Sequence, residues 1–339
     1  AGGFAAHTLV IHKRKTIAPE ESRHVLCRLK DKKICRIYVL MSRDWESVFT
    51  TWSKGPSDTE KTKAENAESQ IRQAISASPK LQNRNIVVFT QGSYRNRVNV
   101  RQDSDVDIGV LCYDTFFPEY PDDNVKMLLE SRTVDSTYTY QLFKNEIEEA
   151  LVARFGRTSV KRGNKSFDIK KNTYRVEADV AAFFEHRLYT STTNYISGVE
   201  MIPDDRQPFM VRNWPEQHYT NGVYKNDNTD RHYKRIVRIL KSLSNEMAAE
   251  GIEIAEKTPS FLIECLVWNA PNTCLSFETY KSMLRSVLAH LFNNTLSEDK
   301  CSNWGEVSEL KYLFRGSQPW TYQQAHKFVS AAWDYVGYE

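Results

Sequence analysis

The chemistry that this sequence can carry is indicated by a glycine turn close to a pair of carboxylates. Gly92 and Ser93 follow the apolar run 86–90, and Asp105 and Asp107 begin a second run in which apolar residues alternate with others. The first pattern predicts a buried strand that ends in a sharp turn, and the second predicts another strand. Because side chains alternate along a strand, both carboxylates share a face, with Cα atoms roughly 7 Å apart.

Carboxylates at this spacing suit hard divalent cations. Mg²⁺ prefers carboxylate and phosphate oxygens, and a glycine turn that offers a hydroxyl and backbone N–H groups suits phosphate. Two such ions about 3.5–4 Å apart would activate an attacking hydroxyl and neutralise a leaving pyrophosphate. A Gly-Ser pair alone is usually a turn, and an Asp-x-Asp pair alone is usually a solvated strand end. Together they favour a metal and nucleotide site.

The combination resembles the signature of the nucleotidyltransferase superfamily related to DNA polymerase beta. The wider pattern resembles the bacterial cGAS/DncV-like nucleotidyltransferases, or CD-NTases, and among them clade E. This resemblance covers residues 41–339 in order and spacing. The segments that carry it are Gly92–Asn96, Asn99–Arg101, Asp103–Asp107, Asn213–Pro215, His218–Gly222, Tyr233–Lys241 and Pro259–Cys265.

The resemblance implies an α+β fold with two lobes. A polymerase-beta-like nucleotidyltransferase core, with a mixed sheet and helices, is expected together with the connection over 41–228. A helical C-terminal lobe is expected over 229–339. Residues 1–40 fall outside the resemblance and carry nine Lys or Arg against three acidic residues. We interpret them as a basic extension added by cloning or mis-annotation ahead of a start near Met41, with a genuine basic hairpin as the alternative.

A third carboxylate is expected on the strand that contains Glu177 and Asp179. These residues share a face, so spacing does not choose between them. The resemblance selects Asp179, because the family places its third metal ligand in a similar Ala-Asp-Val setting. It implies two Mg²⁺ ions, or Mn²⁺, held by three catalytic residues: Asp105, Asp107 and Asp179. We interpret Glu177 as a solvated strand residue, with a supporting role near the metal as the alternative.

The resemblance also implies a set of nucleotide-binding residues: Gly92, Ser93, Lys241, Ser260 and Asn213. Lys241 lies in a helical stripe of basic residues that lacks acidic partners at i+4, and Ser260 lies in the first turn of a helix, where free N–H groups favour phosphate. Without the family, we would interpret the stripe as a solvated face and the serine as an ordinary first-turn residue.

Asn213 precedes a Trp-Pro pair, as an asparagine does in clade E members that use pyrimidines. An amide can donate to O4 of uracil and accept from its N3–H at the same time. The alternative is an asparagine that stabilises a turn. We therefore expect a pyrimidine substrate, with uridine ahead of cytidine.

The implied reaction joins and cyclises two ribonucleoside triphosphates, with UTP and ATP expected, into a product such as cyclic UMP-AMP or cyclic di-UMP. The resemblance implies that this product activates a separate effector in antiphage signalling (CBASS). One alternative is a template-independent RNA-tailing nucleotidyltransferase, and another is a catalytically inactive nucleotide-binding protein. The net charge is +3 and residues 1–40 carry +6, so the remainder carries about −3, which speaks against a nucleic acid partner.

The cysteine pattern indicates a reducing compartment. Six cysteines show no Cys-x-x-Cys spacing, and the chain has no signal peptide and no apolar run near 18 residues. We expect a bacterial cytoplasmic enzyme that does not enter a membrane, with neither disulfides nor structural zinc.

Local patterns predict the elements that must position the site. A Ser57–Glu60 capping box opens a helix to Ser76, and Thr229 and Gly251 bound another. Other expected elements are a helix over 140–155, strands near 167–170 and 174–184, a connecting loop over 189–229, and a helix that Thr258 and Pro259 cap.

Overall fold

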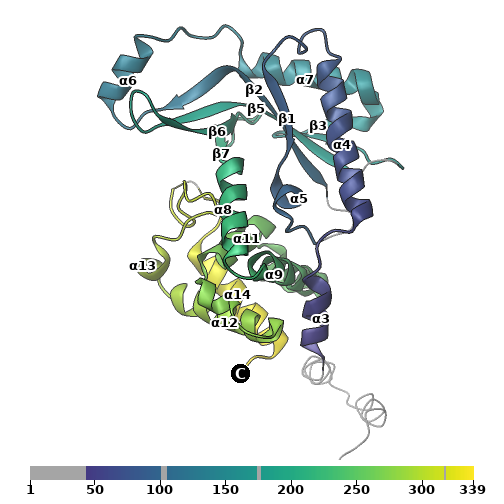
Figure 1. Cartoon of the computed structure of the whole chain (residues 1–339), viewed down its shortest axis with the longest axis vertical. Coiled ribbons are helices and arrows are strands. Elements are labelled where there is room, and N and C mark those ends of the chain that lie inside the picture. The colour runs from purple at the N-terminus through teal and green to yellow at the C-terminus, as the bar shows by residue number, and fades with distance from the viewer. Residues whose placement is uncertain (1–42, 101–104, 174–176, 317) are drawn as a thin grey trace, which may run out of the picture.

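Two lobes make up the molecule in the computed structural model, which describes residues 43–100, 105–173, 177–316 and 318–339. Figure 1 shows a lobe built on a β-sheet above a lobe of helices, with the helix α8 (Pro215–Asp227) running between them. Residues 1–40, for which a basic extension or hairpin was predicted, lie outside the described residues. We retain the division at 228/229 as a proposal.

The sheet of the first lobe is mixed, as predicted. Its strand order is β1-β2-β5-β4-β3, with β6 paired to β5 and β7 to β6. Only β2 and β5 run parallel among the described pairs, and the others are antiparallel. The strands are β1 (Ile86–Thr90), β2 (Val106–Glu119), β3 (Val160–Arg162), β4 (Phe167–Ile169), β5 (Ala178–Tyr189), β6 (Tyr195–Met201) and β7 (Val211–Asn213).

Two long helices of this lobe confirm the sequence predictions. The helix α4 (Asp58–Ser76) begins at the predicted capping box, in which Ser57 accepts from the backbone of Glu60 and the Glu60 carboxylate accepts from Ser57. The helix α7 (Tyr140–Phe155) has the predicted bounds. Both pack on the core that the strands β2 and β5 build. Shorter helices of this lobe are α5 (Gly92–Asn96), α6 (Asp123–Glu130) and the 3₁₀ turn η1 (Arg157–Ser159).

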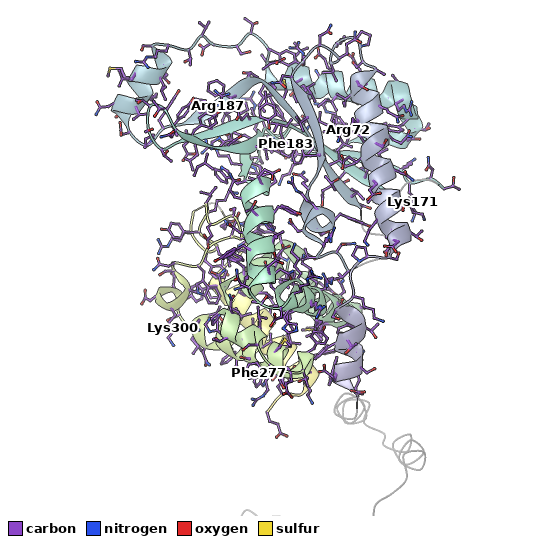
Figure 2. All side chains as sticks on the ribbon, in the orientation of Figure 1. Arg72, Lys171, Phe183, Arg187, Phe277 and Lys300 are labelled. Carbon is purple, nitrogen blue, oxygen red and sulfur yellow. The ribbon has the colours of Figure 1, made fainter. Side chains whose placement is uncertain are left out.

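The second lobe has its own core, formed around a helix that is buried along most of its length. This helix is α9 (His232–Ala249), and apolar residues of α3, α11, α12 and α14 join it in one cluster. The elements around it are α3 (Trp45–Trp52), α10 (Glu253–Glu256), α11 (Ser260–Asn269), η2 (Asn272–Leu275), α12 (Tyr280–Asn294), α13 (Glu298–Cys301) and α14 (Tyr322–Val336). Figure 2 shows side chains filling both lobes, with the buried Phe183 in the sheet lobe and Lys300 at the edge of the helical one.

Several predicted boundaries are wrong. The segment 189–229 is not a loop, because it contains β6, β7 and the whole of α8. Thr229 does not cap α9: the cap is Arg231, in a left-handed conformation, while the Thr229 hydroxyl donates back to the Lys225 carbonyl. That hydroxyl also accepts from the backbone N–H of Tyr233. Thr229 therefore stabilises the turn that precedes α9, two residues before the cap.

One further boundary differs by a few residues. The strand predicted over 174–184 is β5, which begins at Ala178 and continues to Tyr189. The start of α11 is confirmed, because Pro259 is its N-cap and Ser260 is its first residue. No helix in the described part of the chain is long and apolar enough to cross a bilayer.

Candidate active site

The predicted carboxylates lie on neighbouring strands of the sheet. Asp107 on β2 is directly opposite Asp179 on β5 in the parallel ladder. Asp105 lies just before β2 and is exposed, whereas Asp107 and Asp179 are half-buried. Glu177 lies just before β5, where its carbonyl accepts from the backbone of Val106. The structure therefore brings Asp105, Asp107 and Asp179 into one neighbourhood.

Burial and mutual repulsion raise the pKa values of these carboxylates. Burial, with the negative charges of Asp179 and Asp105, raises the pKa of Asp107 to about 6. Burial, with the charges of Asp105, Asp168 and Glu177, raises the pKa of Asp179 to about 6. The pKa of Asp105 is raised as well, by burial and by Glu177. Like charges held this close together destabilise one another's ionised forms, and a bound cation would remove that repulsion.

Asp168 is a carboxylate of this cluster that the sequence analysis missed. It lies opposite Asp179 in the antiparallel pairing of β4 with β5, and it is one of the groups that raise the pKa of Asp179. The alternation of Phe167, Asp168 and Ile169, with both apolar residues buried, was the signal that could have found it. Glu177 is also half-buried and acts on the pKa of Asp179, which favours the supporting role over a fully solvated one.

The glycine turn is packed directly against one of the predicted metal-binding carboxylates. Gly92 has a φ of +64°, and a Cβ added to it would lie 2.1 Å from Oδ2 of Asp107. The backbone N–H of Gln91 donates to the Asp107 carbonyl at 2.8 Å, which ties the turn to β2. Only glycine combines this conformation with this approach. Ser93, the second residue of α5, is half-buried beside it.

This arrangement fits a divalent cation. The acidic side chains that gather here offer carboxylate oxygens, the donors that Mg²⁺ prefers, and the missing Cβ of Gly92 leaves room for the Asp107 carboxylate. Among the residues that the structure describes, no three His, Cys, Asp or Glu side chains are yet placed as a ready metal-binding group. The carboxylates would have to turn toward a common ion.

Lys241 reaches this site from the helical lobe, but it is not part of a solvated stripe. Its side chain is 3% exposed and donates to Oε2 of Glu264 at 3.1 Å. The positive charge of Lys241 lowers the pKa of Asp107, although burial and the neighbouring carboxylates raise it by more. No acidic residue stands at i+4 from Lys241, as the sequence showed, and its acidic partner comes instead from α11.

The rest of the basic stripe has a different role. Lys234 and Arg238 are also buried, and Arg238 donates to the carbonyls of Ser53 and Arg97. Arg97 directly follows α5, so Arg238 links the helical lobe to the helix that begins with the glycine turn. A lone basic residue on a helix gives no signal of such a partner, which is why the sequence could not show it.

The two remaining predicted residues lie at the exposed ends of elements. Ser260 is the exposed first residue of α11. Asn213 is the exposed last residue of β7, and its Oδ1 accepts from Nζ of Lys311 in the helical lobe at 3.3 Å. It is held by a strand pairing with Val199, and so the predicted alternative of a turn-stabilising residue does not describe it.

Close packing fixes the backbone at Asn213. A Cβ on Gly198 would lie 2.8 Å from the Asn213 carbonyl oxygen and 2.7 Å from Nε1 of Trp214. Trp214 is buried and meets the ring of His186 edge to face. The asparagine is therefore presented to solvent by a rigid strand and a buried tryptophan.

The comparisons with known proteins agree with this geometry. The profile of the cGAS/DncV-like nucleotidyltransferase C-terminal helical domain matches residues 220–337. A cyclic dipyrimidine nucleotide synthase CdnE of Legionella pneumophila is 44% identical over 301 residues, which cover 87% of this chain and 99% of that protein.

Two solved structures share this fold over most of the chain. The Elizabethkingia meningoseptica CdnE cyclic dinucleotide synthase, with GTP and Apcpp, has a TM-score of 0.72 at 35% identity and covers 86% of this chain and 99% of its own. The Rhodothermus marinus CdnE c-UMP-AMP synthase, with Apcpp and Upnpp, has a TM-score of 0.75 at 28% identity. This match covers 86% of this chain and 97% of that synthase.

Proposed function

Because this chain belongs to the cGAS/DncV-like nucleotidyltransferases, as a relative of the CdnE cyclic dinucleotide synthases, we propose that it joins and cyclises two ribonucleoside triphosphates, one of them a pyrimidine nucleotide. It is thus an enzyme that transfers nucleotidyl groups. The observation that carries the proposal is the pairing of Asp107 with Asp179 beside the Gly92 turn.

Asp105, Asp107 and Asp179 would hold the metal. Enzymes of this family generally use Mg²⁺, and we propose two ions here, which would supply a Lewis acid for the α-phosphate and for the departing pyrophosphate. The raised pKa values of Asp107 and Asp179 favour this role, because a cation would stabilise their ionised forms. Asp168, opposite Asp179 on β4, would add negative charge that a cation at this site would also offset.

The triphosphate would lie between the two lobes. Gly92 and Ser93 offer the backbone and hydroxyl of a turn on the sheet lobe. From the helical lobe, Lys241 offers a positive charge close to Asp107, and Ser260 offers a hydroxyl at the start of α11. Aligning a ribose hydroxyl of one nucleotide with the α-phosphate of the other would supply much of the rate enhancement.

Asn213 would select the pyrimidine. It is exposed at the junction of the lobes, and its amide group carries both a donor and an acceptor. The name of the Legionella relative and the Upnpp in the Rhodothermus structure support a pyrimidine, while the GTP in the Elizabethkingia structure belongs to a relative with a different choice. We propose uridine first, with ATP or a second UTP as partner.

Mass spectrometry of the reaction products tests this proposal. The purified chain is incubated with ATP, GTP, CTP and UTP and Mg²⁺ or Mn²⁺, with no nucleic acid. A cyclic dinucleotide that contains uridine is expected, and its release would allow it to act on a separate effector in antiphage signalling. Linear tails that form only when RNA is added would instead favour the tailing reaction, and no product at all would favour an inactive nucleotide-binding protein.

A further inference from the structure

Three buried ionisable side chains from three helices meet behind the proposed triphosphate site. His218 of α8 contacts Oε1 of Glu264 through Nε2 at 2.9 Å, and Lys241 of α9 donates to Oε2 of the same carboxylate at 3.1 Å. His218, Glu264 and Lys241 are 8%, 4% and 3% exposed. Each oxygen of the Glu264 carboxylate therefore has one partner, and each partner comes from a different helix.

This network keeps its carboxylate charged inside the protein. Although burial opposes ionisation, the charge of Lys241 and the contact with His218 lower the pKa of Glu264 to about 2. A buried charge is costly unless it is paired and hydrogen bonded, and removing one partner leaves the other uncompensated. Glu264 therefore determines where the Lys241 ammonium lies.

Lys241 has capacity left for a ligand. An ammonium carries three N–H donors, and within the described part of the chain it makes a hydrogen bond to Glu264 alone. Its charge already acts on Asp107 in the catalytic sheet. A phosphate beside Asp107 would thus contact the Lys241 ammonium, which Glu264 holds in position.

The helix α11 joins this network to the second proposed phosphate ligand. Ser260 and Glu264 are four residues apart on it and so lie on one face. Phe261, between them in sequence, contacts the His218 ring with a centroid distance of 5.7 Å. Glu264 thereby connects Lys241 on α9 to the start of α11, where Ser260 lies.

We propose that Glu264 is a positioning residue that holds the Lys241 ammonium against the nucleoside triphosphate, and that His218 fixes the Glu264 carboxylate for this purpose. The inference rests on the proposed function of the site. The competing role is purely structural, in which the same contacts join α8, α9 and α11 and do nothing for the ligand.

Nucleotide binding to single and double variants separates these roles. The ligands are a non-hydrolysable UTP analogue and UMP, each with Mg²⁺, and the proteins are wild type, Glu264→Gln, Lys241→Met and the double variant. Glu264→Gln keeps the shape of the side chain and removes its charge. The proposal expects roughly tenfold weaker binding of the UTP analogue and less than about twofold change for UMP, because only the triphosphate reaches Lys241. In the Lys241→Met background, Glu264→Gln should change neither affinity by more than about twofold.

Three results would overturn the proposal. Equal losses for UTP analogue and UMP, or losses that add in the double variant, would show a structural role. If Lys241→Met binds the analogue as tightly as the wild type does, Lys241 does not contact the triphosphate and the proposal is wrong. A wild type that binds neither ligand would instead refute the proposed function.

A second variant covers the case in which Glu264→Gln does not fold. His218→Phe removes the contact to Oε1 and leaves the ion pair with Lys241, so binding of the UTP analogue should weaken by about threefold with UMP unchanged. His218→Gln, whose amide can still donate to the carboxylate, should bind the analogue as wild type does. If His218→Phe affects both ligands equally, the positioning role is wrong.

Discussion

Asp107 and Asp179 face each other across the parallel pair β2 and β5, where burial and the neighbouring carboxylates disfavour the charged form of each. A sheet that only needed to fold would not place two aspartates side by side in this way. Without a cation, the ionised pair lowers the free energy of unfolding. A cation that binds both carboxylates would restore it.

The pH dependence of stability follows from this pair. The pKa values near 6 lie above 3.8, the ordinary value for aspartate, so the folded state binds these protons more tightly than the unfolded chain does. Their contribution to stability is therefore present below about pH 4 and is lost as the pH rises through about 6. Mg²⁺ should offset this loss because it binds the ionised pair.

Melting curves with EDTA or with Mg²⁺ at about pH 5 and pH 7.5 measure this effect. With Mg²⁺ at ~100-fold its Kd, we expect a rise in Tm of about 5 °C at the higher pH and a smaller rise at the lower one. The double variant Asp107→Asn/Asp179→Asn is the control and should show no rise. An equal Mg²⁺ effect at both pH values would contradict the assignment.

The contact between Gly92 and Asp107 gives a second prediction. Gly92→Ala should lower turnover on the order of 10²-fold, because the new Cβ would have to displace the Asp107 carboxylate and strain the left-handed backbone. Gly55→Ala is the matched control, since nothing lies within 4 Å of a Cβ there, and it should keep wild-type turnover. The measurement is the rate at which each variant forms cyclic product. Equal rates for the two variants would show that the Gly92 turn is not part of the active site.

Base selection tests the role of Asn213. Asn213→Ser should shift incorporation from a pyrimidine toward a purine, since the loss of a paired donor and acceptor costs about 1–3 kcal/mol of discrimination. The competition uses labelled ATP, GTP, CTP and UTP, and Asn228→Ser, an exposed asparagine after α8, is the control. If the wild type incorporates only purines, or if the substitution slows every product equally, the uridine proposal fails.

Removal of residues 1–40 should leave turnover and Tm almost unchanged. The described core begins at Trp45, and the ion pair of Arg43 with Glu246 would be retained. Thermal melts and product formation by the shortened chain are the measurements. A large loss of either would show that the basic segment packs on the rest of the protein.

Local signals predicted the elements that they determine. The capping box at Ser57 and the alternation after Asp105 correctly placed α4 and β2, because caps and period-two patterns depend on neighbours in sequence. Asp179 could be chosen over Glu177 only from the family resemblance. The register that places it opposite Asp107 depends on how β2 and β5 pair, which no local pattern states.

Features that depend on distant contacts were missed. The partners of Lys241 and Arg238 lie on other elements, so their burial could not be foreseen from a basic stripe on one helix. The segment 189–229 was predicted as a loop because its Asn, Asp, Pro and Gly residues favour turns, yet sheet pairing with β5 forms β6 and then β7. Tertiary context overrode composition there.

The most direct test of the account is the fate of the α-phosphate of labelled UTP in the presence of ATP and Mg²⁺, with no RNA. Wild-type protein should convert the label into a product that resists phosphatase, because a cyclic dinucleotide has no terminal phosphate. Asp107→Asn should fold and yet lower this conversion on the order of 10³-fold, since an amide is a poor ligand for Mg²⁺. Near wild-type conversion by Asp107→Asn, or a wild-type product that phosphatase degrades completely, would contradict the account.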